Sequence, residues 1–422
     1  MKRSLGIVLA CLSFATAGLY YGCSDVTSPY TKASGPNPPG SATLQKVESA
    51  SNSFSTSLFD QVAAQEQGKN FFISPFSVSM ALAMTLNGAL GQTYDDMQQT
   101  LGLNGLSNDE INLSYQNLMA TFSSLDPGVK FDIANSIWYR DTFAVEDSFL
   151  DVDSTYFDAR VSALDFSNPG AADIINSWVS DDTNNKVTKI IQPPIDPRAV
   201  MFLINALYFN GTWKYTFDSK YTKPGTFYLA NGSTESDSMM VVHDTLNYYA
   251  DQSLTAVELP YGRGDYSMLI LLPTNAASAM NTIGTISQSE VNSIVSELRP
   301  EDVQLTMPKF KLKYSTSLIK ALSQMGMGIA FSDGANFTKI NPAGGLYISE
   351  VLHSTYIDVN EQGTEAAAVT VVEVWKTVVI GEHSGPIMVN VNRPFAFLIK
   401  EKRDNTILFM GAVMEPGVEV TD

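Results

Sequence analysis

The chain has 422 residues, enough for one large domain or for two or three smaller ones. It holds 26 Lys and Arg residues against 44 Asp and Glu residues, and this net charge of −18 argues against nucleic-acid binding, which requires clustered cations. A hydrophobic content of 44% excludes a disordered chain, and the chain has no cysteine after Cys23 to form a disulfide, a thiol nucleophile or a thiolate zinc site.

The N-terminus has the pattern of an export signal. Lys2 and Arg3 precede an apolar run at residues 5–15, which is too short to cross a bilayer of about 30 Å and is typical of a secretory signal peptide. The residues YYGC, ending at Cys23, resemble the cleavage box of bacterial lipoproteins. We predict a signal peptide over residues 1–22 and lipidation of Cys23, with an ordinary cleaved signal as the alternative.

The segment after the predicted cleavage site is rich in Pro, Ser, Thr and Gly. Such a composition cannot bury apolar surface, so we predict a lipid-anchored flexible linker over residues 23–45. Residues 46–422 show no repeat and no second linker, and we expect them to form one domain. The expected location is secreted or extracellular, or the outer membrane of a bacterium as a lipoprotein, with the membrane reached only through the lipid.

Helices are predicted early in this domain. In residues 70–91, Ser74 is placed to cap a helix with Pro75 in its first turn, and Gly91 to end it. Apolar residues cover most of its circumference, which indicates a buried helix. Two capping boxes predict further helix starts: Thr93 with Asp96, and Ser107 with Glu110.

Strands are predicted in the middle of the domain and towards its end. Alternating apolar residues at 129–133 and at 310–314 indicate strands with one buried face, and residues 256–273 read as two strands around a glycine-rich turn. Residues 201–209 are apolar on both faces apart from Asn205, which needs hydrogen-bond partners inside a central strand. Early helices followed by strands favour an α+β domain.

Residues 361–385 form the most unusual segment. The even-numbered positions from Thr364 to Val374 are all small or β-branched, whereas Glu365, Glu373 and Trp375 have the opposite parity. Because side chains alternate along a strand, the even set could enter a core while the odd set faces solvent. By itself this pattern is equally typical of an ordinary sheet strand.

The sequence around this segment resembles the serpin family over nearly the whole domain, and within it the miropin-like inhibitory serpins. The serpin hinge, Glu-x-Gly-Thr followed by small residues, corresponds to Glu361, Gly363, Thr364, Glu365, Ala366, Ala367 and Ala368. The family's buried polar cluster corresponds to Ser74, Ser77, Asn205 and His353. Trp213 matches the tryptophan at the breach, the top of the main sheet where insertion begins.

The resemblance implies a serpin fold: a large mixed β-sheet with an exposed reactive-centre loop, additional smaller sheets and about eight or nine helices. In inhibitory serpins a protease cleaves the loop and becomes acylated, and the loop then inserts into the sheet and distorts the protease. The small, uncharged even-numbered residues suit this insertion, because a buried charge would cost several kcal/mol. We therefore expect a monomeric inhibitor of serine proteases, with cysteine proteases as further targets, and a non-inhibitory binding serpin as the alternative.

The spacing of the family from the hinge glycine places the cleaved bond at Thr377, or at Lys376 with a shift of one residue. Lys376 suits the carboxylate-lined pocket of trypsin-like proteases, although an exposed lysine can also serve only solubility. Val374 and Val378 suit elastase-like proteases and Trp375 a chymotrypsin-like one.

Catalytic readings are weak. No Gly-x-Ser-x-Gly elbow is present, and the Ser-x-x-Lys pattern at Ser317 has no accompanying Lys-Thr-Gly. The three histidines, His243, His353 and His383, are far apart in the sequence. We therefore expect neither an enzyme nor a metal site nor any cofactor.

Overall fold

The computed structural model describes residues 40–365 and 385–417 of the chain. This part contains helices and strands in two sheets, and the predicted α+β class is confirmed. The α-helices of the described part are α1 (Ser41–Glu66), α2 (Pro75–Leu86), α3 (Gly91–Thr100), α4 (Asn108–Ser124), α5 (Asp147–Phe157), α6 (Ala171–Asp182), α7 (Ala276–Ile283), α8 (Gln288–Glu297) and α9 (Ile319–Leu322). In these residues no helix is both long and apolar enough to cross a bilayer.

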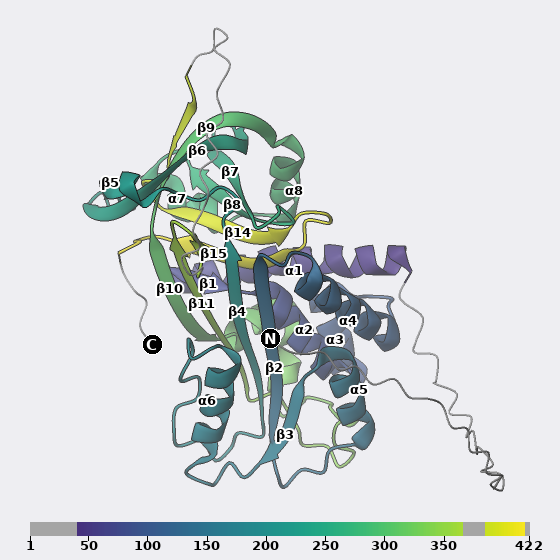
Figure 1. Ribbon diagram of the computed structural model, residues 1–422. Helices are drawn as coiled ribbons and strands as arrows, with labels where there is room; N and C mark the ends of the chain where they lie inside the picture. The colour runs from purple at the N-terminus through teal and green to yellow at the C-terminus, as the bar shows by residue number, and fades with distance from the viewer. Residues whose placement is uncertain (1–39, 366–384, 418–422) are drawn as a thin grey trace, which may run out of the picture. The chain divides into compact units, whose positions relative to one another are not determined.

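One sheet has six strands and stands upright in the centre of Figure 1. Its order is β10 (Phe310–Ser317), β11 (Glu350–Asn360), β12 (Gly363–Thr364), β4 (Met201–Thr212), β2 (Val129–Arg140) and β3 (Arg160–Leu164). β11 also pairs directly with β4. The sheet is mixed, because β11 runs parallel to β4 and β2 parallel to β3 while the other pairs are antiparallel.

The other sheet has nine strands. Eight of them lie in the order β1 (Phe71–Ile73), β15 (Ile407–Val413), β14 (Phe395–Glu401), β8 (Tyr266–Pro273), β7 (Leu254–Tyr261), β6 (Thr234–Ala250), β9 (Arg299–Pro308) and β13 (Ile387–Asn390). The ninth, β5 (Lys223–Tyr228), pairs with β6. The strands predicted at 129–133, 201–209, 256–273 and 310–314 are all present, as parts of β2, β4, β7 with β8, and β10.

The helix starts show where local sequence patterns suffice. The capping box of Ser107 and Glu110 is confirmed at the start of α4. The predicted box at Thr93 is wrong: α3 already begins at Gly91, and the Thr93 hydroxyl accepts a hydrogen bond from the backbone N–H of Asn336 at 2.9 Å. A partner from a distant loop has replaced the local one.

The predicted buried helix is confirmed with a different end. α2 follows Ser74 and Pro75, every one of its residues is buried, and it stops at Leu86. Gly91, with φ of +56°, opens the next helix instead of closing this one. Residues 41–45, which the sequence assigns to the linker, lie in the first turns of α1.

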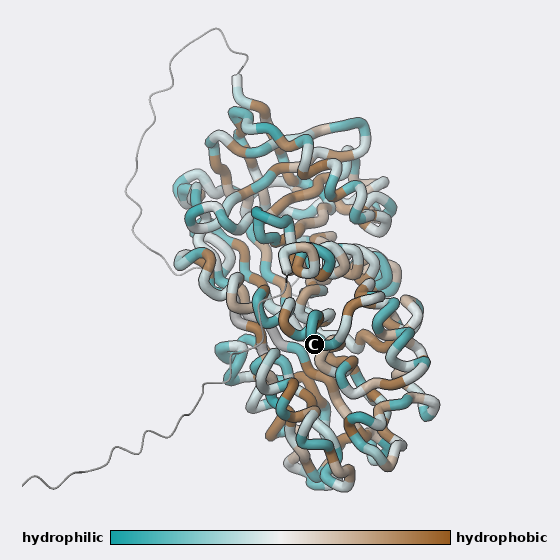
Figure 2. The backbone as a smooth tube through the Cα atoms, turned by 90° about the vertical axis from the view of Figure 1, so that its right-hand side faces the viewer, coloured by the Kyte–Doolittle hydropathy of each residue, from teal (hydrophilic) through white to brown (hydrophobic). Residues whose placement is uncertain are grey.

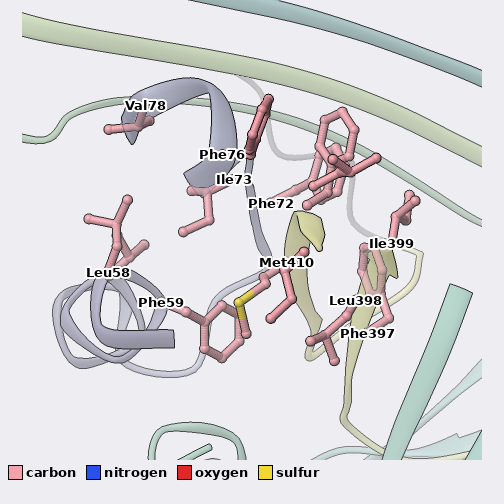
Figure 3. Packing of buried hydrophobic residues seen from close by; sticks show 14 of the residues in the cluster. Leu58, Phe59, Phe72, Ile73, Phe76, Val78, Phe397, Leu398, Ile399 and Met410 are labelled. Carbon is pink, nitrogen blue, oxygen red and sulfur yellow. The ribbon is translucent and has the colours of Figure 1, made fainter. Parts of the chain in front are cut away.

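The main core lies between α1, α2 and strands of the nine-stranded sheet. Figure 3 shows Leu58 and Phe59 of α1 facing Ile73 and Met410, with Phe397 close to Phe72. The ring centroid of Phe72 lies 5.6 Å from that of Phe397 and 5.1 Å from that of Phe409. Burial of such side chains stabilises the domain by about 1.5–3 kcal/mol each, and apolar segments run through its interior in Figure 2.

Candidate functional site

The centre of the six-stranded sheet contains a seam that is closed along one part and open at the end. β4 and β11 pair directly, in parallel, from Phe202 with Glu350 to Leu207 with Thr355. Beyond this stretch the short strand β12 enters between them and pairs antiparallel with both, at Gly211 and at Val359. A longer strand at this position would have to separate β4 from β11, so the sheet has an entrance and a closed interior.

The entrance is shaped for a glycine followed by a small polar residue. A Cβ atom on Gly363 would lie 2.1 Å from the carbonyl oxygen of Gly211, so no other residue fits there without moving the strand. The side chain of Thr364 is fully buried, and its hydroxyl lies 2.6 Å from the Tyr261 hydroxyl in a hydrogen bond. Burial raises the pKa of Tyr261, which therefore stays neutral.

The turn before β12 is anchored from several elements. The Glu361 carboxylate pairs with Lys309 Nζ at 3.0 Å and accepts a hydrogen bond from the Thr222 hydroxyl at 2.9 Å. Burial by itself would raise the pKa of Glu361, but hydrogen bonds, above all from Lys309, lower it overall. Trp213 donates from its ring nitrogen to the carbonyl of Asn360 at 2.9 Å. These contacts fix the start of the hinge.

Trp213 lies at the open end of the seam, beside the turn that precedes β12. It is buried, stacks on Tyr261 with ring centroids 4.3 Å apart, and its backbone N–H donates to the carbonyl of Gln362 at 2.8 Å. It therefore contacts both the strand that precedes the hinge and the tyrosine that receives Thr364.

The four predicted polar residues beneath the sheet come together across the closed part of the seam. His353 on β11 accepts a hydrogen bond at Nε2 from the backbone N–H of Ser74 at 3.0 Å, so its Nδ1–H donates to Asn205 Oδ1 on β4 at 2.8 Å. The Asn205 amide nitrogen donates to Ser77 on α2 and, at 2.6 Å, to Asn135 on β2. Asn205 therefore has Ser77 and His353 as hydrogen-bond partners, while the Ser74 hydroxyl donates to the carbonyl of Leu408 at 2.7 Å.

The hydrogen bonds of this cluster hold the two strands of the seam together. The hydrogen bond from His353 to Asn205 joins β11 directly to β4, and any strand that enters between them must break it. His353 is fully buried, and this burial lowers its pKa to about 3. The imidazole is therefore neutral at ordinary pH, as its two hydrogen bonds require.

Helix α6 covers the closed part of the seam from the other face. Its apolar residues pack with Phe202 and Ile204 of β4 and with Leu352 of β11, which are on opposite sides of the seam. Figure 1 shows α6 beside the lower half of this sheet. An entering strand would pass beneath α6.

The remaining predicted residues lie outside the described residues. These are the three hinge alanines Ala366, Ala367 and Ala368, the residues at the predicted cleavage sites, Val374, Trp375, Lys376, Thr377 and Val378, and the predicted lipidation site Cys23. Within residues 40–365 and 385–417, no group of three or more His, Cys, Asp or Glu side chains is placed to hold a metal ion.

Sequence reasoning missed several residues of the site, including Lys309 and Thr222 beside Glu361. Tyr261, Asn135 and Lys186 contact Thr364, Asn205 and Glu365 respectively. The hairpin that carries Tyr261 and the strand that carries Asn135 were both predicted. Which of their side chains reach the seam depends on the order of strands in the sheet, and Lys186 lies in a loop with no periodic signal.

A match to known proteins decides the family. The profile described as "Serpin (serine protease inhibitor)" matches residues 49–416. The chain belongs to the serpin family.

This serpin is 34% identical over 378 residues to intracellular coagulation inhibitor 2 of Tachypleus tridentatus, an alignment that covers 88% of this chain and 91% of the relative. Among solved structures, the thermophilic serpin tengpin in its native state gives a TM-score of 0.80 at 31% identity, covering 90% of this chain and 95% of tengpin. Human thyroxine-binding globulin in complex with thyroxine gives 0.81 at 28%, covering 89% and 99%. The predicted serpin fold is confirmed.

Proposed function

We propose that this serpin is a suicide-substrate inhibitor of serine proteases, with cysteine proteases as a second class of target. The protease nucleophile forms an ester or thioester with the carbonyl of the cleaved residue and releases the amine of the next one. The new loop end then enters the sheet as a strand and carries the acylated protease with it. The serpin itself catalyses no reaction, and the protease does not turn over because the cleaved serpin stays bound to it through the acyl bond.

The single observation that carries the proposal is the seam with a hinge already at its entrance. Gly363 and Thr364 pair with both β4 and β11, while six residues of each strand further along still pair with one another. The sheet therefore has room for a strand only if the seam opens. Such a protein stores the pairing energy of one missing strand until the loop is cut.

The register at the entrance supports this proposal, because it can be extended along β4 and β11 to the rest of the segment. Thr364 pairs with Gly211 of β4 and with Val359 of β11. In the same antiparallel register, Thr370, six residues further along, would lie opposite Asn205 and His353. Because opposed residues in antiparallel strands share a face, Thr370 would meet the polar cluster from within the sheet. The Thr370 hydroxyl would supply a hydrogen-bonding group in place of the broken bond between His353 and Asn205. An apolar residue at this position could not, so threonine favours insertion.

We place the cleaved bond between Lys376 and Thr377, with cleavage after Thr377 as the nearest alternative. Val374, Trp375 and Val378 remain further sites for proteases with apolar pockets. The test is incubation with a trypsin-like, an elastase-like and a chymotrypsin-like protease, followed by denaturing electrophoresis and N-terminal sequencing of the released fragment. We expect a covalent complex that survives SDS and a large rise in the melting temperature after cleavage. Fragments alone, with an unchanged melting temperature, would contradict inhibition.

A second candidate is a non-inhibitory serpin that binds a partner. The likeness to thyroxine-binding globulin, whose structure holds thyroxine, favours this alternative. The two are distinguished by the same experiment, because a binding serpin without strand insertion is cleaved without forming a covalent complex.

We further propose that residues 1–22 direct export and that acylated Cys23 tethers the serpin to a bacterial outer membrane. Labelling with a radioactive fatty acid, compared between the native chain and Cys23→Ser, tests this. Equal labelling of both would refute the anchor.

A further inference from the structure

Glu365 ends the seated part of the hinge with a nearly buried carboxylate. Its side chain is 5% exposed and forms an ion pair with Lys186 Nζ. Its backbone N–H donates to the carbonyl of Asp358 at 2.7 Å, and its own carbonyl accepts from Asn210 Nδ2 at 2.7 Å. With φ of +56°, it is also the residue at which the backbone leaves the strand conformation.

Lys186 belongs to the loop that follows α6, and hydrogen bonds and a buried side chain hold that loop in place. Asn184 and Asn185 both have left-handed backbones, with φ of +51° and +62°, a conformation that asparagine tolerates better than most residues. Val187 is fully buried, and its N–H donates to the Thr183 hydroxyl at 3.1 Å. These features define the backbone path on both sides of Lys186.

The surroundings balance charge around the pair. Lys186 Nζ lies 5.0 Å from the ring centroid of Tyr356, and Lys311 Nζ lies 5.9 Å from the same centroid. Lys311 itself pairs with Asp358 at 3.3 Å. Two lysines thus lie over one aromatic ring, each paired with a carboxylate. Removal of Lys186 would leave the Glu365 carboxylate buried without its ion-pair partner.

We propose that Lys186 is a positioning residue for loop insertion. Its ion pair with Glu365 compensates the buried carboxylate charge, holds the hinge at the open end of the seam and links the hinge to the loop after α6. Because the first residues of the hinge already pair with β4 and β11, strand insertion can continue from them as soon as the loop is cut. The α6 loop and the hinge are also coupled, since α6 packs over the closed part of the seam. The consequence for inhibition rests on the proposed function, whereas the seating itself is a property of the intact chain.

The test uses the intact protein and compares Lys186→Gln with two other variants. Lys186→Arg keeps the charge, and Lys189→Gln removes an exposed charge from the same loop. The first measurement is hydrogen exchange at the Glu365 amide, read by mass spectrometry of a peptide that contains it. The second is the stoichiometry of inhibition, the moles of serpin consumed for each mole of protease trapped.

We expect exchange at the Glu365 amide to accelerate about tenfold or more in Lys186→Gln, because a buried charge without its partner favours the expelled hinge. The stoichiometry of inhibition should rise in the same variant. Lys186→Arg and Lys189→Gln should both behave like the native chain, and exchanging the charges in Lys186→Glu with Glu365→Lys should restore seating. A general loss of stability would raise exchange throughout the sheet rather than at the hinge.

Unchanged exchange at Glu365 in Lys186→Gln overturns the seating role, whatever the protein inhibits. Faster exchange with an unchanged stoichiometry in an active inhibitor overturns the claim that seating aids insertion. Absence of any covalent complex from the native chain would instead refute the proposed function, while the exchange result still decides whether Lys186 seats the hinge.

Discussion

Replacing Thr364 with arginine tests whether the hinge is the leading end of an inserting strand. The native side chain is fully buried and shares a hydrogen bond with Tyr261. Thr364→Arg places a guanidinium without a carboxylate partner in this position, which costs about 3–5 kcal/mol, and it removes a partner from the Tyr261 hydroxyl, which costs about 1–3 kcal/mol more. In the intact protein the arginine escapes this cost by leaving the sheet, since β12 consists of Gly363 and Thr364 alone in the part of the chain that the structure describes.

During insertion the cost cannot be avoided, because the strand must pass through this position. A barrier higher by about 4 kcal/mol slows insertion about a thousandfold, so hydrolysis of the acyl-enzyme overtakes it. We expect Thr364→Arg to be cleaved as a substrate, with little SDS-resistant complex and a stoichiometry of inhibition raised at least about tenfold. Thr364→Ser keeps the hydroxyl and serves as the matched control, with near-native inhibition.

The position and rate of cleavage by the protease distinguish slow insertion from damage to the loop itself. Thr364→Arg should be cleaved at the same bond as the native chain and at a similar rate. If the arginine variant traps protease as efficiently as the native serpin, the hinge does not enter the sheet at Thr364 and the assignment fails.

Three further predictions concern stability. His353 binds fewer protons in the folded state, where its pKa is about 3, than in the unfolded chain, so its contribution to the free energy of unfolding is complete above pH 6.5 and decreases below it. Urea unfolding at pH 5.5 should show that this residue has lost about 1.4 kcal/mol of that contribution. The loss should be absent in His353→Gln. Gly363→Ala should expel the hinge, because its Cβ would meet the Gly211 carbonyl, and faster hydrogen exchange at residue 364 would show this; unchanged exchange would contradict the close fit. Glu258 and Lys400 form a buried ion pair at 2.9 Å, so Glu258→Gln should lower the unfolding free energy by about 3–5 kcal/mol, and a loss below about 1 kcal/mol would show that Lys400 finds another partner.

Residue patterns were reliable where a residue's neighbours in the chain decide its structure. The box of Ser107 and Glu110 closes on itself within one turn, and the apolar run at residues 201–204, which predicts a strand covered on both faces, is buried. Thr93 has an equally plausible local pattern, yet a backbone N–H from Asn336 occupies its hydroxyl. A local signal fails where a stronger partner arrives from elsewhere in the chain.

The hinge composition, the parity of the segment after it and the need of Asn205 for polar partners are properties of the sequence alone, because alternation and hydrogen-bonding capacity are local. The tertiary structure decided that β12 lies between β4 and β11, that Tyr261 receives Thr364 and that Lys186 meets Glu365. These contacts join residues far apart in the chain, and only the order of strands in the sheet and the path of the loop after α6 bring them together.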